Sequence, residues 1–260
     1  MRPIWTGAIG FGLVNIPVKL YSATQSSTLD LDMLDKKDHS HIRFKRVNEQ
    51  TGKEVKWEDI VKGYKYNDQY VVLTDKDFEA ASAKKTKVIE ISDFIKEGEI
   101  NTMYYETPYY LEPDKSGVRA YALLREALRK TGKIGVATFV MRNKESLAMI
   151  KPLDKVLVLH RARFGEEIRD YNELNLPGKA EVKANELQMA IALIDQQSRK
   201  FDIASYRDSY TDTLMDIIRS KAKGKGPAKT PRMKVVHSQP QDLMEQLKAS
   251  LNRKQHKKAS

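Results

Sequence analysis

Segments in which apolar and polar residues alternate recur through the first 165 residues, and they constrain the fold more than any other feature. Alternation of this kind places apolar side chains on one face of a β-strand. Residues 4–24 carry two such segments, with Ile9 and Phe11 in the first and Ile16, Val18 and Leu20 in the second. The same kind of pattern predicts further strands over residues 42–47, 70–74, 87–92, 103–111, 134–141, 147–150 and 156–160.

One long helix interrupts these strands. Residues 118–131 place Tyr121, Leu124 and Leu128 on one helical face, and Gly132 follows as a typical helix end. A shorter helix is predicted over residues 75–83, because Thr74 and the acidic residue three positions later are spaced as a capping box. Many short strands with one long helix favour a β-barrel or a strongly curved antiparallel sheet. The predicted fold class is mainly β with helices.

Three glycines near the N-terminus, Gly7, Gly10 and Gly12, invite comparison with a nucleotide-binding loop. Their order is G-x-x-G-x-G, and Pro17 lies where a phosphate-binding helix would have to run. We therefore interpret these glycines as bends or bulges in a curved sheet.

After residue 165 the pattern changes from strands to helices. Asn185 is predicted to cap a helix in which Leu187, Ile191 and Ile194 recur at helical spacing. Two amphipathic helices need an apolar surface to cover, either on their own barrel or on that of another copy of the chain. The second helix carries its apolar residues on one side: Tyr206, Tyr210, Leu214, Ile217 and Ile218.

The last forty residues hold nearly all of the unbalanced charge. Residues 221–260 contain eleven Lys and Arg against two acidic residues, a net charge of +9, whereas the other 220 residues have a net charge of +2. A segregated cationic segment attracts phosphate polyanions, an anionic membrane or an acidic partner. Glycine and proline interrupt residues 221–239, which predicts a flexible linker, and no aromatic amphipathic segment adjoins it to enter a bilayer. Nucleic acid is the predicted partner.

Beyond this linker, Leu243, Leu247 and Leu251 lie four residues apart, which predicts a helix of about three turns. A helix of this length is marginally stable alone in water. Its apolar stripe, which includes Met244, is expected to dock either into the groove of a partner protein or back on the body of the chain.

No catalytic motif is found in the sequence. The absence of cysteine excludes disulfides and thiolate metal sites and is typical of a reducing cytosol, and no segment has the length of a membrane span. No Gly-Lys pair completes a phosphate-binding loop, and no serine lies in a Gly-x-Ser-x-Gly elbow. His39 and His41 form a close pair without an evident third metal ligand, so we interpret them as surface residues.

These observations predict a soluble, non-enzymatic protein without cofactor or metal. The alternatives are a metal-dependent nuclease or nucleotidyl transferase, whose acidic ligands would be distant in sequence, and an architectural or RNA-binding protein.

Basic residues form several clusters that would hold a phosphate backbone if they lined one concave surface. Any cluster taken alone is also typical of a solvated face, because 33 acidic residues balance those of the body. The candidate DNA-binding set joins the body clusters with the linker cations: Lys36, Lys37, Arg43, Lys45, Arg46, Lys84, Lys85, Lys87, Arg125, Arg129, Lys130, Lys133, Lys221, Lys223, Lys225, Lys229, Arg232 and Lys234.

The sequence resembles the bacterial Ku proteins, which bind DNA ends in non-homologous end joining. The motifs that carry the resemblance follow the family's order over essentially the whole chain. They are Trp5-x-Gly7, FGLVNIPVKLY at residues 11–21, IVKGY at 60–64, YVVLT at 70–74, YYLxP at 109–113, AYALLREAL at 120–128, and Asp242-Leu243-Met244 continuing to Leu251.

The resemblance implies a β-barrel core with helical arms, and two copies joined as a homodimeric ring that threads onto a duplex end. It also implies that the tail recruits a multidomain ATP-dependent DNA ligase, and that the protein works at the nucleoid in the bacterial cytoplasm. Relatives often carry cysteines near residues 47–52, which are absent here, so thiolate metal binding at that turn is not expected.

This resemblance assigns residues 1–170 to the barrel with its inserted helix, and 171–220 to the dimerising arm. Residues 221–239 are the basic linker, and 240–260 are the docking helix with a basic end. The expected dimer contacts are Leu187, Ile191, Ile194, Tyr210, Leu214 and Ile217, and the expected ligase contacts are Leu243, Met244, Leu247 and Leu251.

Overall fold

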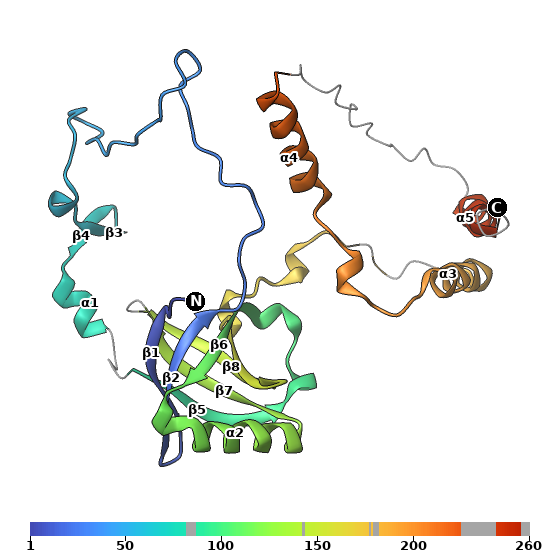
Figure 1. Ribbon diagram of the computed structural model, residues 1–260, viewed down its shortest axis with the longest axis horizontal. Helices are drawn as coiled ribbons and strands as arrows, with labels where there is room; N and C mark the ends of the chain where they lie inside the picture. Colours follow the sequence, from blue (N-terminus) through green and yellow to red (C-terminus); the bar gives the residue numbers. More distant parts are fainter. Residues whose placement is uncertain (82–86, 142–143, 177, 179–181, 225–242, 256–260) are drawn as a thin grey trace. The chain divides into compact units, whose positions relative to one another are not determined.

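The alternating segments fold into a closed β-barrel in the computed structural model of the chain (Figure 1). The strands follow each other around the barrel in the order β1-β2-β6-β9-β8-β7-β5. All neighbouring pairs are antiparallel except β1 and β5, which are parallel. The predicted barrel is thereby confirmed, and its strands are β1 (Trp5–Phe11), β2 (Val14–Ser22), β5 (Val88–Lys96), β6 (Tyr105–Pro113), β7 (Lys133–Met141), β8 (Lys144–Leu153) and β9 (Val156–Ala162).

The structure describes residues 1–81, 87–141, 144–176, 178, 182–224 and 243–255. Two units are distinguished along the chain: Met1–Ser26 with Asp30–Asp170, and Ser27–Leu29 with Tyr171–Ser260. Within the described ranges, no helix is long and apolar enough to cross a membrane.

The barrel interior is filled by the apolar half of each alternating strand. Ile16, Val18 and Leu20 are fully buried on β2, and Leu157 and Leu159 are fully buried on β9. Burial of an aliphatic side chain of this size stabilises a fold by about 1.5–3 kcal/mol. The apolar residues that recur at every second position in the sequence are therefore the residues that fill the core.

Glycine allows the barrel to close between β1 and β5. A Cβ atom on Gly7 would lie 2.2 Å from the carbonyl oxygen of Lys87, the residue that precedes β5. Gly12, in the turn between β1 and β2, has a φ of 58°, a left-handed conformation that favours glycine. The interpretation of these glycines as structural is confirmed, although Gly7 permits a close approach of two strands rather than a bulge, since the β1–β2 register is unbroken.

Helix α2 (Val118–Thr131) packs against the barrel and ends at Gly132, as predicted. Its buried face consists of Tyr121, Leu124 and Leu128. The hydroxyl of Tyr121 donates to the carbonyl oxygen of Leu111 on β6 at 2.7 Å and accepts from the amide of Leu157 on β9 at 2.6 Å. A single side chain thus joins the helix to two neighbouring strands.

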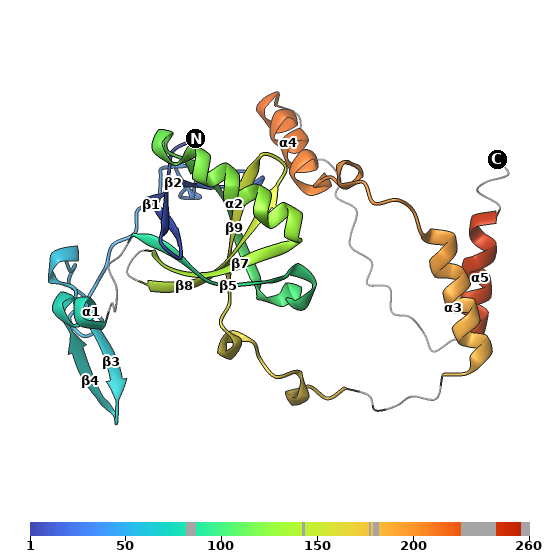
Figure 2. The same ribbon diagram turned by 90° about the horizontal axis from the view of Figure 1, so that it is seen from below.

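The chain between β2 and β5, which we call the insert (residues 23–87), contributes no strand to the barrel in its described residues, 23–81 and 87. It contains β3 (Lys62–Tyr66), β4 (Gln69–Leu73) and α1 (Asp75–Ala81), and β3 and β4 form a separate two-stranded sheet (Figure 2). The cap of α1 is as predicted, because the amide and hydroxyl of Thr74 both donate to Asp77 Oδ2, at 2.7 and 2.6 Å. Residues 82 and 83 of that predicted helix lie outside the described residues.

Two strand predictions need correction. Residues 42–47 form no strand but are flanked by two isolated bridges, Leu34 with His41 and Val47 with Glu54. The segment has no long pairing partner, and it covers no apolar core, since every residue in that range is exposed. Strand β6 begins at Tyr105 rather than at residue 103, because a 3₁₀ turn occupies Thr102–Tyr104, and Asn101 Oδ1 caps it by accepting from the amide of Met103.

The second unit contains helices α3 (Ala184–Gln197), α4 (Ser209–Ala222) and α5 (Leu243–Gln255). The predicted cap Asn185 is wrong, because α3 begins one residue earlier and Lys183 is its N-cap residue. Asp208 caps α4 by accepting from the amides of the second and third helical residues, at 3.0 and 3.3 Å. Tyr206 therefore lies before α4 and not on its apolar side.

Candidate nucleic-acid interface

The insert carries the first group of candidate cations on two successive turns. Lys36 and Lys37 lie in the turn closed by the Leu34–His41 bridge. Lys45 and Arg46 lead into the next turn, which is closed by the Val47–Glu54 bridge. These cations are exposed, as is Arg43 between the two turns, so the structure brings the group onto one solvated segment outside the barrel.

Two cations of the insert are held by neighbouring side chains. Lys45 Nζ donates to Glu54 Oε2 at 2.7 Å, and this hydrogen bond raises the pKa of Lys45. The guanidinium carbon of Arg46 lies 4.7 Å from the centroid of the Trp57 ring, a cation–π contact. Both side chains keep their charge and remain accessible to a polyanion.

Exposed aromatic residues accompany these cations. Phe44 and Trp57 are 80% and 71% exposed, and three tyrosines on β3 and β4 are exposed as well, namely Tyr64, Tyr66 and Tyr70. Exposed aromatic side chains that form a contiguous patch mark interaction surfaces, so these residues are candidates for contact with a partner. Sequence reasoning missed this group, although the alternation of Lys and Tyr in KGYKY at residues 62–66 was a visible signal.

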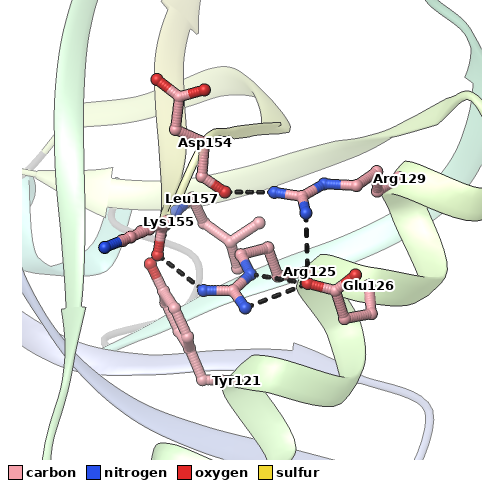
Figure 3. Close-up of polar contacts among 7 residues, drawn as sticks. All are labelled: Tyr121, Arg125, Glu126, Arg129, Asp154, Lys155 and Leu157. Atoms are coloured by element: carbon pink, nitrogen blue, oxygen red, sulfur yellow. Dashed lines mark hydrogen bonds and ion pairs between the residues drawn. The ribbon is translucent and has the colours of Figure 1, made fainter.

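The second group of candidate cations lies on α2 and at the first residue of β7, and its two arginines, both on α2, have structural partners (Figure 3). Arg125 Nη1 donates to the carbonyl oxygen of Lys155 at 2.7 Å, and Arg129 Nη2 donates to the carbonyl oxygen of Asp154. Glu126 Oε1 accepts from Arg125 Nη2 at 3.0 Å and lies 3.5 Å from Arg129 Nη1. The two guanidinium groups thus fasten the β8–β9 turn to α2 and share one carboxylate.

Lys130 and Lys133 differ from these arginines. Both are exposed, and no ion pair is found for either in the part of the chain that the structure describes. Lys130, on α2, and Lys133, the first residue of β7, are therefore the cations of this group best able to meet a phosphate. Lys87, the residue that precedes β5, is also exposed, whereas Lys84 and Lys85 lie outside the described residues.

The helices of the second unit carry the candidate dimer contacts. Leu187, Ile191 and Ile194 of α3 are 51%, 48% and 64% exposed, and Tyr210 of α4 is exposed too. Leu214 and Ile217 are half-buried on α4. Lys221 and Lys223 are exposed at the end of α4, while the remaining linker candidates lie outside the described residues: Lys225, Lys229, Arg232 and Lys234.

The tail helix α5 packs against α3. Its residues Met244, Leu247 and Leu251 are half-buried, and Leu243 is its first residue. Of the two docking sites expected for this stripe, a partner or the chain itself, the structure shows an intrachain site, on an arm helix rather than on the barrel.

Titratable side chains gather at one further place, between β6, β8 and β9. The rings of Tyr105 and His160 meet edge to face at a centroid distance of 5.1 Å, and Lys151 Nζ lies 2.6 Å from Glu97 Oε1 beside them. Burial, and then the nearby Lys151, lower the pKa of His160, whereas Glu97 opposes that shift. Across the described ranges, no group of three or more His, Asp or Glu residues is placed to hold a metal ion.

Comparison with known proteins extends over the barrel, the insert and the arm. The family described as the Ku70/Ku80 beta-barrel domain matches residues 10–189. The Non-homologous end joining protein Ku of Opitutus terrae is 43% identical over 238 residues, which cover 89% of this chain and 86% of that protein. The protein of the same name from Bacillus subtilis is 38% identical and covers 97% and 82%, and that from Archaeoglobus fulgidus is 40% identical and covers 96% and 98%.

Proposed function

Because the chain belongs to the Ku family of non-homologous end joining proteins, we propose that it binds the ends of double-stranded DNA irrespective of sequence. The observation that carries this proposal is the insert. It is a long exposed segment outside a closed barrel, with Arg43, Lys45 and Arg46 on its surface. Contacts with phosphates position a protein on DNA without reading its bases.

A ring that encloses the duplex needs more than one copy of this chain. We infer a homodimer, which is supported by the apolar side chains that α3 exposes at Leu187, Ile191 and Ile194. The exposed aromatic residues of the insert support it as well, because a single copy would leave them in water. Two-fold symmetry of such a dimer would match the approximate two-fold symmetry of a duplex.

The net charge of +2 on residues 1–220 sets a condition for this ring. A nearly neutral body holds a polyanion when its cations face the bore and its acidic residues face away. The exposed lysines Lys130 and Lys133, and the cations of the insert, are the proposed bore residues. Arg125 and Arg129 are weaker candidates, since backbone carbonyls and Glu126 already occupy their donors.

The tail is proposed to recruit the enzyme that seals the break, an ATP-dependent DNA ligase. In this scheme residues 1–170 enclose the DNA and residues 171–220 dimerise. Residues 221–239 add electrostatic capture at the nucleoid, and residues 240–260 carry the ligase-docking helix. The leucine spacing of α5 supports the last role, because an amphipathic helix with such a stripe fits an apolar groove.

A competition experiment tests end binding. A labelled linear duplex is displaced by unlabelled linear DNA or by covalently closed circular DNA of the same length and sequence. Linear DNA is expected to compete far better, because a closed circle offers no end. Equal competition by both forms would refute end recognition and would favour an architectural DNA-binding protein. Nucleotide release in the presence of Mg²⁺ or Mn²⁺, abolished by a chelator, would contradict a non-enzymatic role.

A further inference from the structure

Helices α3 and α5 lie side by side in the second unit (Figure 2). Four residues of α3 at positions i, i+3, i+4 and i+7 line the seam between them: Asn185, Gln188, Met189 and Ala192. Met244 and Lys248, one turn apart on α5, complete it. At the other end of the pair, Gln196 Nε2 donates to the carbonyl oxygen of Leu251 at 3.4 Å. The two helices therefore run in the same direction.

The face that α5 turns to this seam is its apolar stripe. Met244, Leu247 and Leu251 are half-buried, whereas Glu245 is exposed and Lys248 is exposed at the rim of the seam. On α3, Met189 and Leu193 are half-buried as well, whereas Leu187, Ile191 and Ile194 of the same helix are exposed. Packing against α3 explains why α5 is helical, because a helix of thirteen residues is only marginally stable without a packing partner.

We propose that α3 is the resting-state binding site of the α5 stripe, so that a partner protein must displace α3 before it can bind the tail. This inference rests on the proposed recruitment of the ligase through α5. The same side chains cannot be covered by α3 and by the groove of another protein at once. The contact with α3 therefore lowers the apparent affinity for the partner in proportion to the fraction of time that α5 is undocked.

The proposal links two measurable quantities. If α5 is docked on α3 for about nine-tenths of the time, its release increases partner affinity about tenfold. The same equilibrium slows hydrogen exchange of the α5 amides, because exchange occurs mainly from the undocked helix. Release of α5 from α3 should therefore accelerate hydrogen exchange of the α5 amides and increase the affinity for the partner by similar factors.

Ala192→Lys is the variant that releases α5. It places a long cationic side chain in the seam beside Lys248, and it preserves the helix because alanine and lysine are both good helix formers. Ala184→Lys is the matched control, since Ala184 is exposed at the first position of α3. Both variants add the same charge to the same helix, and the full-length chain is used throughout.

Hydrogen exchange followed by mass spectrometry is measured first, on a peptide covering residues 243–255. Ala192→Lys is expected to accelerate exchange in this peptide, while Ala184→Lys and wild type exchange alike. Peptides from α2 and the barrel strands should not change in either variant, which excludes global unfolding. Equal exchange in Ala192→Lys and wild type would overturn the proposed contact.

Binding of the ATP-dependent DNA ligase to the same three proteins is then titrated. Ala192→Lys is expected to bind more tightly by about the factor measured in exchange. Equal or weaker binding by an Ala192→Lys protein whose α5 exchanges rapidly would refute the competition while leaving recruitment intact. Absence of ligase binding by all three proteins would refute recruitment itself, and with it the competition, although DNA end binding would be unaffected.

Discussion

The hydroxyl of Tyr121 offers a sharp test of how α2 is joined to the barrel. Tyr121→Phe removes an acceptor for the buried amide of Leu157 and a donor to the carbonyl oxygen of Leu111. Tyr121 is 5% exposed and Leu157 is fully buried, so water does not replace the lost hydroxyl. Leaving a buried polar group without its partner lowers the free energy of unfolding by about 1–3 kcal/mol. Most of this loss comes from the Leu157 amide, because an amide has a single hydrogen to donate.

We therefore expect Tyr121→Phe to lower the free energy of unfolding by about 2 kcal/mol. For a domain of this size, such a loss lowers Tm by about 4–8 °C. Urea denaturation and calorimetry measure the two quantities. DNA end binding well below the new Tm should be unchanged, because Tyr121 faces the core rather than solvent.

Tyr105→Phe is the matched control for this prediction. The Tyr105 hydroxyl is also buried, yet it has no hydrogen-bond partner among the described residues, and burial raises the pKa of both tyrosines. Tyr105→Phe removes a buried polar group that has no hydrogen bond to compensate for its lost hydration, so the variant should be as stable as wild type or slightly more stable. A Tyr121→Phe protein that loses no more stability than Tyr105→Phe would refute the bridging role of the hydroxyl.

Three further predictions concern charge. Lys130→Gln and Lys133→Gln should each reduce the slope of log affinity for DNA against log salt by about 0.9, whereas Arg129→Gln should mainly reduce stability; wild-type slopes in both lysine variants would exclude the lysines from the bore. The pKa of His160 is lower in the folded state than its ordinary value of 6.5, so its contribution to stability is fully present above pH 6.5 and is lost as the pH falls through the folded-state pKa. Thermal unfolding of wild type and His160→Gln across this pH range checks the sign, since Tm of the variant should decline less on acidification. Deletion of residues 221–260 should preserve the dimer and the preference for ends while it weakens binding and flattens the salt dependence, and loss of the dimer in analytical ultracentrifugation would contradict the assigned division of the chain.

Much of the barrel could be predicted from local patterns, because strand periodicity and core periodicity are the same. The alternation at Ile16, Val18 and Leu20 identified residues that are fully buried. The closure of the barrel was not predictable in the same way. It depends on parallel pairing of β1 with β5, which are separated by the whole insert, and on the space that Gly7 leaves for Lys87.

Residues 42–47 show where the local pattern fails. Ile42 and Phe44 alternate with basic residues as in a strand, although Arg46 ends the alternation, and a strand also needs a neighbour to satisfy its backbone groups and an apolar surface to cover. The insert provides isolated bridges instead. Whether an alternating segment becomes a strand is thus decided by tertiary structure.

The basic residues of the candidate site could be identified from the sequence, but their contacts could not. Arg129 and Lys130 are adjacent in sequence, equally cationic and both exposed, but Arg129 donates to the carbonyl oxygen of Asp154 whereas no ion pair is found for Lys130 among the described residues. That distinction depends on a turn 25 residues further along the chain. The stripe of α5 was likewise visible in the sequence, whereas its position on α3 required the fold.

Topological trapping tests the proposed enclosure of DNA most directly. The protein is loaded on a linear duplex, the ends are ligated into a closed circle, and the complex is washed with salt that removes the protein from linear DNA. A closed ring predicts that the protein stays on the circle through the wash and leaves after a single restriction cut. Release from the closed circle by the same salt that releases it from linear DNA would contradict enclosure of the duplex.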